Sequence, residues 1–281
     1  MSGTQSGDVA VAVAPNGGRK TKADHPALPL DPEELARTAA ACLEAGAAMI
    51  HLHVRTPEGR HLLDAGAYRS VIDAVRRETG DGLLIQITSE ALGLYRPPEQ
   101  IAVVRETRPE AVSLALREIA PTPDDLLPFL DLLAWMKREA VLPQIILYEP
   151  SEAVRLAELR DRGGLPFDDI PVLYVLGRYT AGQTSAPADL LPFLEASQPP
   201  FSNRMVCAFG RHETACLTAA GLLGANLRTG FENNTTLPDG REAAANEELV
   251  ASLAIALKAC GRGLADADAL RSQMLHTLGQ I

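Results

Sequence analysis

The sequence of 281 residues predicts an α/β fold, the (β/α)8 or TIM barrel, on the basis of three observations. Eight short apolar runs alternate with longer segments of helical period, which is the rhythm of eight strand–helix units. The runs are apolar throughout, as expected for parallel strands that are covered on both faces. No linker or change of composition divides the chain. We therefore predict a single barrel domain over residues 1–281, with a short polar N-terminal extension (1–8) and a C-terminal tail (264–281).

The elements follow from local patterns along the chain. The first strand, "VAVAVAP", stops at Pro-Asn-Gly-Gly, and the first helix has Asp31 at its N-cap, Pro32 at its first position and Gly46 near its end. The predicted strands cover 9–15, 49–55, 83–90, 111–118, 144–150, 171–179, 204–210 and 226–234. The later helices cover 67–78, 98–107, 123–140, 151–164, 187–196, 212–225 and 246–260. A doubly wound sheet is the competing architecture, although no GxGxxG follows the first strand. The tail is expected to pack on the barrel or on another subunit.

Composition narrows the class of protein. A net charge of -10 and a pI of about 5.1 argue against nucleic acid or an anionic membrane as the main partner. The start is polar, and no apolar run approaches the roughly 18 residues that a membrane helix needs. Dispersed cysteines without CxxC spacing indicate free thiols in a reducing compartment. We therefore expect a soluble cytoplasmic protein with the free thiols Cys42, Cys207, Cys216 and Cys260.

The strand "MIHLHVR" contains two histidines, His51 and His53, which share one face because they are two residues apart. Chemistry in such barrels gathers at the C-terminal ends of the strands, where Glu232 of "RTGFENN" also lies. The second and eighth strands both flank the first once the barrel closes, so the three side chains can meet. Two imidazoles and a carboxylate, with a position left open, indicate a catalytic zinc site. Alternatively, the histidine pair has no ligand role, and Glu232 only pairs with Arg228 in a structural ion pair.

The residues that carry this pattern also resemble a known family. "PNGGRKTKADHPALPLDPEELARTAAACLEAGAAMIHLHVR", and then "RTGFENN" followed by "DGREAAANEELV", are similar to the β-keto acid cleavage enzymes, formerly a domain of unknown function. The resemblance extends from Val11 to the final helix. It implies a (β/α)8 barrel that forms a homo-oligomer, either a dimer or a tetramer.

The resemblance also implies a reaction and a site. Zn2+ would be held by His51, His53 and Glu232, and the enzyme would join a β-keto acid with acetyl-CoA to give acetoacetate and a new acyl-CoA. Zinc would polarise the ketone as a Lewis acid, and Arg228 matches the family's arginine at the eighth strand, where a guanidinium suits a developing oxyanion. The expected partners are therefore a small keto acid and acetyl-CoA.

The chain departs from the family at the residue after Glu232. Relatives commonly carry an aspartate there that helps the arginine to deprotonate substrate, whereas this chain has Asn233. An amide orients a substrate but accepts no proton at neutral pH. Either another carboxylate acts as the base or the mechanism differs. The substitutes considered, in order, are Glu118 at the end of the strand 111–118, Glu90 and Glu149.

The first loop bears on the substrate. Where family members that cleave 3-keto-5-aminohexanoate place an acid against the substrate amine, this chain has Arg19, followed by Lys20. A cation there repels an amine and attracts a carboxylate, so we expect the distal end of the substrate to be anionic or neutral. The alternative is that Arg19 faces solvent or the CoA phosphates.

Three further residues are assigned to the site. Thr88 matches a hydroxyl position that helps relatives to hold the substrate carboxylate, and Ser113 could act similarly from the next strand. Arg211, in "AFGRHE", opens a helix where barrels often bind phosphate, and is assigned to CoA. Alternatively, Thr88 is only a hydrogen-bonded hydroxyl at a strand end, and Ser113 is only a small residue that fills the barrel. For the segment around Arg211, the alternative is simple helix capping.

Three rival functions stay open. An amidohydrolase would need further histidines on later strands, and none of the remaining histidines lies at those strand ends. A metal-dependent class II aldolase-like lyase would share the metal chemistry but act without CoA. A catalytically inactive relative would bind a keto acid and zinc but form no acyl-CoA product.

Overall fold

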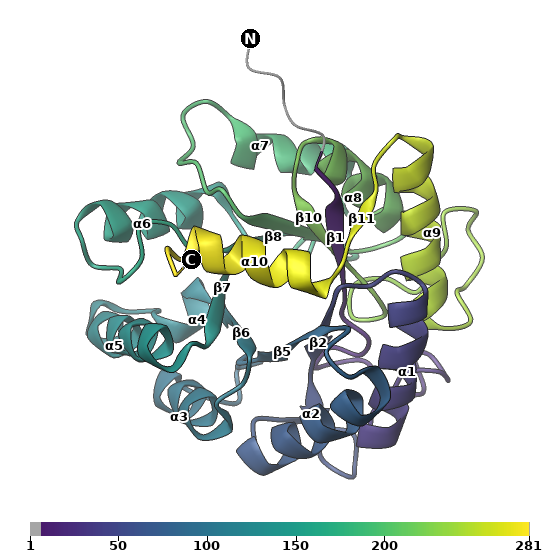
Figure 1. Cartoon of the computed structure of the whole chain (residues 1–281), viewed down its shortest axis with the longest axis horizontal. Coiled ribbons are helices and arrows are strands. Elements are labelled where there is room, and N and C mark those ends of the chain that lie inside the picture. The colour runs from purple at the N-terminus through teal and green to yellow at the C-terminus, as the bar shows by residue number, and fades with distance from the viewer. Residues whose placement is uncertain (1–6, 281) are drawn as a thin grey trace.

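A computed structural model describes residues 7–280, and its central strands form a closed parallel barrel (Figure 1). Neighbouring strands follow chain order, and pairing of the last strand with the first, with Val11 opposite Leu227, closes the barrel. The predicted (β/α)8 barrel is therefore confirmed. Its strands are β1 (Val9–Val13), β2 (Met49–Leu52), β5 (Leu84–Thr88), β6 (Ala111–Ala115), β7 (Leu142–Leu147), β8 (Val172–Leu176), β9 (Arg204–Ala208) and β10 (Asn226–Thr229).

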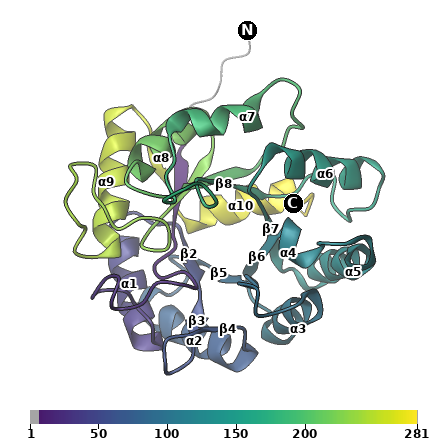
Figure 2. The same ribbon diagram turned by 180° about the vertical axis from the view of Figure 1, so that it is seen from behind.

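Helices surround the barrel as an outer ring, seen from both ends in Figures 1 and 2. Nearly every strand residue is buried, because side chains point either into the barrel or against this ring. The sixth unit departs from the prediction, since its helix is one 3-10 turn followed by one short helix. The ring comprises α1 (Pro32–Glu44), α2 (Ala65–Thr79), α3 (Pro97–Thr107), α5 (Pro123–Glu139), α6 (Pro150–Asp161), η1 (Pro187–Leu190) with α7 (Leu191–Leu194), α8 (Glu213–Leu222) and α9 (Asn246–Ala259).

The helix starts follow the local sequence. The Asp31 side chain accepts a hydrogen bond of 2.8 Å from the backbone N–H of Glu34, and Pro32 occupies the first position of α1 as predicted. Asp64 caps α2 in the same way, through the N–H of Ala67 at 2.7 Å. These caps fix where the chain leaves each loop, and so they fix the loops at the barrel mouth.

All eight predicted strands end earlier than expected, and in two of them the remaining residues form another element. The segment 49–55 splits into β2 and β3 (Val54–Arg55), which pairs antiparallel with β4 (His61–Leu62) in a small hairpin. The segment 111–118 leaves the barrel after Ala115 and continues as α4 (Leu116–Ile119). Glu118 is therefore a helical residue and does not end a strand, which corrects the prediction.

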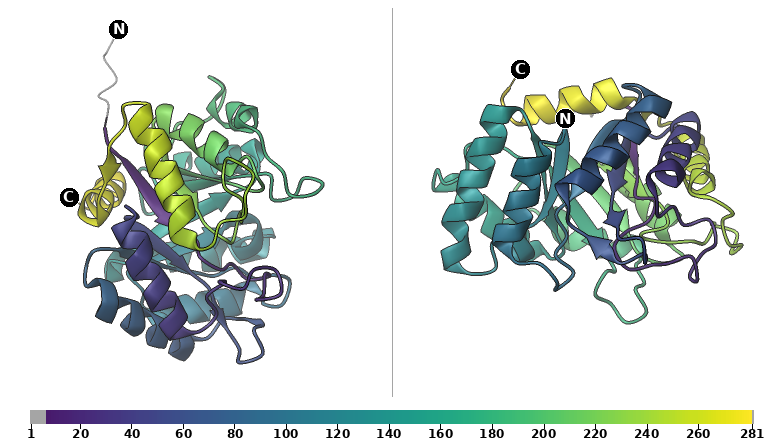
Figure 3. Two further views of the ribbon diagram at one scale, coloured as in Figure 1. Left: turned by 90° about the vertical axis from the view of Figure 1, so that its right-hand side faces the viewer. Right: turned by 90° about the horizontal axis from the view of Figure 1, so that it is seen from below.

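The C-terminal segment closes one end of the barrel. β11 (Leu264–Ala265) pairs with the start of β1, and α10 (Ala267–Thr277) lies across the N-terminal ends of the strands (Figure 3). Residues 1–6 of the predicted N-terminal extension, and residue 281 of the tail, lie outside the described residues. Over residues 7–280, no helix has both the length and the apolar character needed to cross a bilayer.

Candidate metal centre and active site

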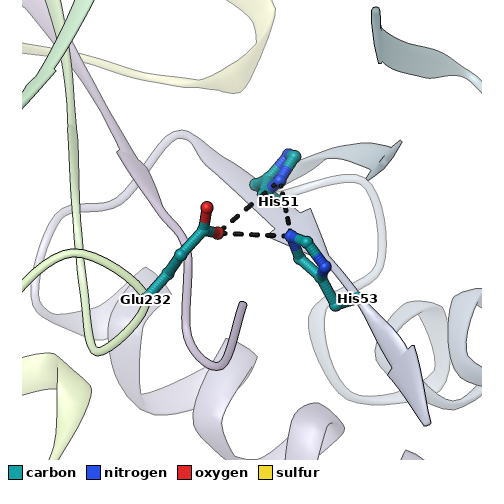
Figure 4. Close-up of side chains that lie close together, drawn as sticks. All are labelled: His51, His53 and Glu232. Carbon is teal, nitrogen blue, oxygen red and sulfur yellow. Dashed lines mark hydrogen bonds and ion pairs between the residues drawn. The ribbon is translucent and has the colours of Figure 1, made fainter. Parts of the chain in front are cut away.

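The three predicted metal ligands meet at the open end of the barrel (Figure 4). His51 lies in β2, His53 follows that strand directly, and Glu232 lies in the turn after β10. Both strands pair with β1, as expected from barrel closure. The Nε2 atoms of the two histidines are 3.2 Å apart, and Oε2 of Glu232 is 3.7 Å from the first and 3.4 Å from the second.

A tight turn carries Glu232 to this position. Gly230 has a φ of 131°, and a Cβ on it would lie 2.4 Å from the carbonyl oxygen of Ala14. The same carbonyl accepts a hydrogen bond of 3.1 Å from the N–H of Glu232. From the other side, a Cβ on Gly17 would lie 2.6 Å from Cγ of Glu232. Two glycines therefore allow the backbone to approach closely and aim the carboxylate at the histidines.

The three side chains fit a divalent metal ion. Their ligand atoms all lie within 4.8 Å of one another. Oε2 of Glu232 is buried and has no hydrogen-bond partner among the described residues, so a buried acceptor faces two imidazole nitrogens. Two histidines and one glutamate are a donor set of catalytic zinc sites, which leave a position for substrate.

Electrostatics keep His51 and Glu232 in the state that a metal requires. Burial, together with the cation of Arg228, lowers the pKa of His51 to about 3, so its ring is neutral. Burial alone would raise the pKa of Glu232, but Arg228 and the two imidazoles hold it well below its usual range. Neutral imidazoles and an ionised carboxylate are the forms that bind metal.

Arg228 lies beside the ligands on β10 and is almost fully buried, with 3% of its side chain exposed. Its Nη2 donates to Oε1 of Glu232 at 3.2 Å and to Sγ of Cys207 at 3.4 Å. The ion pair that sequence reasoning kept as an alternative is therefore present. Nε and Nη1 are buried and have no partner among the described residues, which leaves two donors for an anionic oxygen.

Asn233 is also buried, with 3% of its surface exposed, and neither atom of its side-chain amide has a hydrogen-bond partner among the described residues. The next residue differs, because Asn234 bonds Glu213 and Thr236 through its side chain. Asn233 does not line the cavities at the barrel mouth. Because its side chain is an amide, Asn233 also adds no carboxylate to the site.

Two small adjoining cavities open at the barrel mouth and share Glu90, Arg178, Phe209 and Glu232 in their walls. A larger cavity of about 560 Å³ lies at the opposite end, beside α10, and contains none of the ligands. The smaller cavities are the relevant ones, because chemistry in barrels occurs at the C-terminal ends of the strands. The first is also lined by His51, His53, Thr88, Ile146, Tyr148, Val175 and Arg228, and the second by Asn16, Gly17, Gly18, Arg19, Lys20 and Gln183.

The predicted substrate hydroxyls lie on adjacent strands. Thr88 lines the first cavity, and its Oγ1 accepts a hydrogen bond of 3.0 Å from the N–H of Glu90. Ser113 is opposite Thr88 in the register of β5 and β6, but it lines neither cavity. Its buried Oγ has no partner among the described residues. The structure therefore brings Thr88, but not Ser113, to the cavity wall.

The first loop brings two cations to the second cavity. Arg19 is exposed at its rim, whereas Lys20 is half-buried and donates from Nζ to the carbonyl oxygen of Phe231 at 2.5 Å. Burial lowers the pKa of Lys20, although Glu213 and Glu232 oppose this shift.

Two predicted site residues lie away from the cavities. Glu118, in α4, accepts a hydrogen bond of 2.8 Å from the N–H of Ala91 and lines neither cavity. Burial raises its pKa. Arg211 is exposed, and its Nε donates to Nε2 of His212 at 3.3 Å. It too is absent from both cavity walls.

Sequence reasoning missed Arg178, and it named Glu90 only as a second choice for the base, although both residues line the two cavities. Arg178 follows β8, lines both cavities and pairs with Glu90 at 3.6 Å. Glu90 also approaches Nδ1 of His53 at 3.8 Å. Glu213, the first residue of α8, is fully buried, and burial raises its pKa to about 8. The one available signal was the position of Arg178 near the C-terminal end of the predicted strand 171–179.

Comparison with known proteins agrees with this geometry. A family model described as beta-keto acid cleavage enzyme matches residues 8–275. A 3-keto-5-aminohexanoate cleavage enzyme of Fusobacterium nucleatum is 30% identical over 91% of this chain and 93% of its own length. A 3-oxoadipate:acetyl-CoA acetyltransferase of Cupriavidus necator is 25% identical over 91% of this chain and 90% of its own.

Solved structures show the same fold. The apo structure of ObcA superposes with a TM-score of 0.70 at 18% identity, covering 89% of this chain and 65% of the ObcA chain. That likeness concerns the barrel alone, whereas the family match extends over nearly the whole sequence. The ligand geometry, the buried arginine and this match lead to one conclusion: the chain belongs to the beta-keto acid cleavage enzyme family.

Proposed function

We propose that this protein is a zinc-dependent β-keto acid cleavage enzyme, which condenses a β-keto acid with acetyl-CoA and releases acetoacetate and a new acyl-CoA. The observation that carries the proposal is the convergence of His51, His53 and Glu232 beside the buried Arg228, at the wall of a cavity. Family membership and relatives named for keto acids and acetyl-CoA support it.

The residues divide the chemistry between them. His51, His53 and Glu232 would hold a zinc ion, which would supply a Lewis acid to polarise the substrate ketone. Arg228 offers the buried Nε–H and Nη1–H groups to the substrate carboxylate or to the oxyanion that develops. Thr88, at the cavity wall, would orient the carboxylate. In the reaction, the carbanion next to the ketone attacks the thioester, CoA moves to the substrate acyl group, and a retro-Claisen step breaks the old C–C bond.

The proton acceptor must replace the family aspartate, because the amide of Asn233 accepts no proton. Among the three carboxylates considered, Glu90 lines both cavities. Glu118 is bound to a backbone amide outside them, and Glu149 is largely exposed and pairs with Arg117. We therefore assign the proton transfer to Glu90 in place of Glu118. Glu90→Gln should lower kcat by about 10²–10⁴-fold, as for lost general bases, whereas Glu118→Gln should leave it nearly unchanged.

The cavity walls bear on the substrate class. Arg19, Lys20 and Arg178 line the second cavity together with two carboxylates, of which Glu90 pairs with Arg178 and Glu232 would be engaged by zinc and Arg228. This excess of cations suits a β-keto acid whose distal end is anionic, such as a β-keto diacid, and disfavours an amine. Arg211 remains assigned to the CoA phosphates at the start of α8. We also expect a cytoplasmic homo-oligomer.

The function is tested by incubating zinc-loaded protein with acetyl-CoA and a panel of β-keto acids, and by measuring the masses of the acyl-CoA products. A new acyl-CoA together with acetoacetate is expected, with a diacid preferred over the matching aminated acid. A preference for the amine refutes the assigned substrate class. Turnover of a keto acid without CoA would favour the class II aldolase-like lyase, and zinc and ligand binding without product would favour an inactive relative.

A further inference from the structure

A row of buried polar side chains crosses the barrel interior from one metal ligand. Nδ1 of His51 is 2.7 Å from Oε1 of Gln86, and Nε2 of Gln86 donates to Oε1 of Gln144 at 3.1 Å. Nε2 of Gln144 in turn points at Sδ of Met205, 3.6 Å away. The four residues come from β2, β5, β7 and β9, and each is at most 1% exposed.

The hydrogen bonds of this row run in one donor-to-acceptor direction, because the last residue, Met205, can only accept a hydrogen bond. A thioether sulfur has no proton to donate, so Gln144 must present its NH2 group to Met205 and its Oε1 to Gln86. Gln86 then uses its own NH2 group toward Gln144 and leaves Oε1 for His51. An acceptor opposite Nδ1 requires that this nitrogen of His51 carries the proton.

The alternative arrangement is costly in this environment. If Gln144 turned over, its NH2 group would face the NH2 group of Gln86, and its carbonyl would face the sulfur of Met205. A buried donor or acceptor without a partner costs about 1–3 kcal/mol. Gln86 could then relieve the clash only by turning as well, which would present a donor to Nδ1 of His51 and move the ring proton to Nε2.

The position of the proton matters for the site. With Nδ1 protonated, the lone pair of His51 lies on Nε2, the atom that is 3.2 Å from Nε2 of His53 and 3.7 Å from Oε2 of Glu232. With the proton on Nε2, this nitrogen cannot bind a metal ion. A ligand histidine is usually held in one tautomer by an outer partner on its other nitrogen.

We propose that Gln144, which makes no hydrogen bond to any of the three ligands, is a positioning residue that fixes the tautomer of His51 through Gln86. The inference rests on the proposed zinc site. It extends the machinery of that site from the mouth into the barrel interior, as far as Met205 on β9.

The test compares Gln144→Leu with Gln144→Glu. A buried glutamic acid stays neutral because burial raises its pKa, so its O–H donates to Met205 and its C=O accepts from Gln86, as the amide does. Leucine does neither and frees Gln86 to turn. Thr107→Ala, which changes a buried polar residue of α3, is the control for a general loss of packing.

The first measurement is made on zinc-free protein by ¹⁵N NMR of labelled histidine, with the His51 signals assigned from the loss caused by His51→Gln. The wild type, Gln144→Glu and Thr107→Ala should show a single tautomer protonated at Nδ1. Gln144→Leu should show a mixture of tautomers. If Gln144→Leu fails to fold, Met205→Leu replaces it, because that change removes the terminal acceptor and leaves both glutamines in place.

The second measurement is zinc affinity by competition with a chelator. Gln144→Leu should weaken binding by about 10-fold or more, the usual effect of losing outer support for a ligand, while Gln144→Glu should stay within about threefold of wild type. An unchanged tautomer together with unchanged affinity in the leucine variant overturns the proposal and leaves the zinc site standing. A wild type that binds no zinc refutes the proposed function instead, whereas the tautomer is still read in zinc-free protein.

Discussion

Replacing Arg228 with methionine removes a cation from a buried pair, and the consequence can be sized from the structure. At 3.2 Å, two unit charges attract by about 5 kcal/mol for an effective dielectric constant of about 20. Breaking a buried ion pair by removing one partner typically costs about 3–5 kcal/mol, because the other charge stays buried. Glu232, with 15% of its side chain exposed, is that remaining charge.

This loss of unfolding free energy can be converted into a decrease in melting temperature. An unfolding entropy of about 2.1 cal/mol/K per residue gives about 0.6 kcal/mol/K for 281 residues, so Arg228→Met should lower Tm by about 5–8 °C in zinc-free protein. Zinc supplies another cation to Glu232, so the difference from wild type should shrink in zinc-loaded protein. The assay is thermal unfolding followed by circular dichroism, with a chelator and with saturating zinc.

A matched control is Arg241→Met, which breaks the exposed pair between Arg241 and Asp239 at 2.8 Å. Exposed pairs contribute at most about 1 kcal/mol, so Tm should fall by less than about 2 °C. Two results would refute this reasoning. One is that Arg228→Met and the wild type have the same Tm in the presence of the chelator, and the other is that saturating zinc does not reduce the difference in Tm between them.

Three other predictions concern pH, thiols and metal. Burial raises the folded-state pKa of Glu213 to about 8, so its contribution to stability is lost as pH rises from its unfolded value through about 8. Between pH 5 and 7, Glu213→Gln should therefore gain stability relative to wild type by up to about 1.4 kcal/mol per pH unit. Urea unfolding measures this, and a difference in unfolding free energy that does not change with pH contradicts it. In native protein, a disulfide reagent should titrate Cys260 at once and the other thiols only on denaturation, because burial raises the pKa of Cys42, Cys207 and Cys216. Chelation should abolish acyl-CoA formation in the zinc-loaded enzyme, and added Zn2+ should restore it in wild type but not in His53→Gln; activity that survives chelation counts against a metal role.

The barrel could be predicted from the sequence because its signal is redundant. Eight apolar runs and eight helical segments agree with one another, so an error of a few residues at one boundary leaves the architecture unchanged. The hairpin of β3 and β4 was missed because each of its strands has only two residues, too few for a period to show. Glu118 was misplaced for a related reason, since "LALRE" continues the apolar run of β6 into α4.

The grouping of His51, His53 and Glu232 could be predicted because spacing and strand position together constrain these residues. His51 and His53 share a face by parity alone, and Glu232 is brought beside them by closure of the barrel. The cavity wall could not be predicted in the same way. Arg178 lies in a loop whose path depends on tertiary contacts, and Gln144 faces the interior only because of the register between β6 and β7. A shift of one residue reverses the face of every side chain on a strand.

The separation of the ligands along the chain has a consequence for folding kinetics. Glu232 follows the histidines by about 180 residues, so the site cannot assemble before the last strand has docked on the first, and contacts at such long range form late in folding. An ion bound there would stabilise the native state more than the transition state. The ion would therefore lower the unfolding rate, because β10 would detach from β1 more slowly, and it would leave the folding rate largely unaltered.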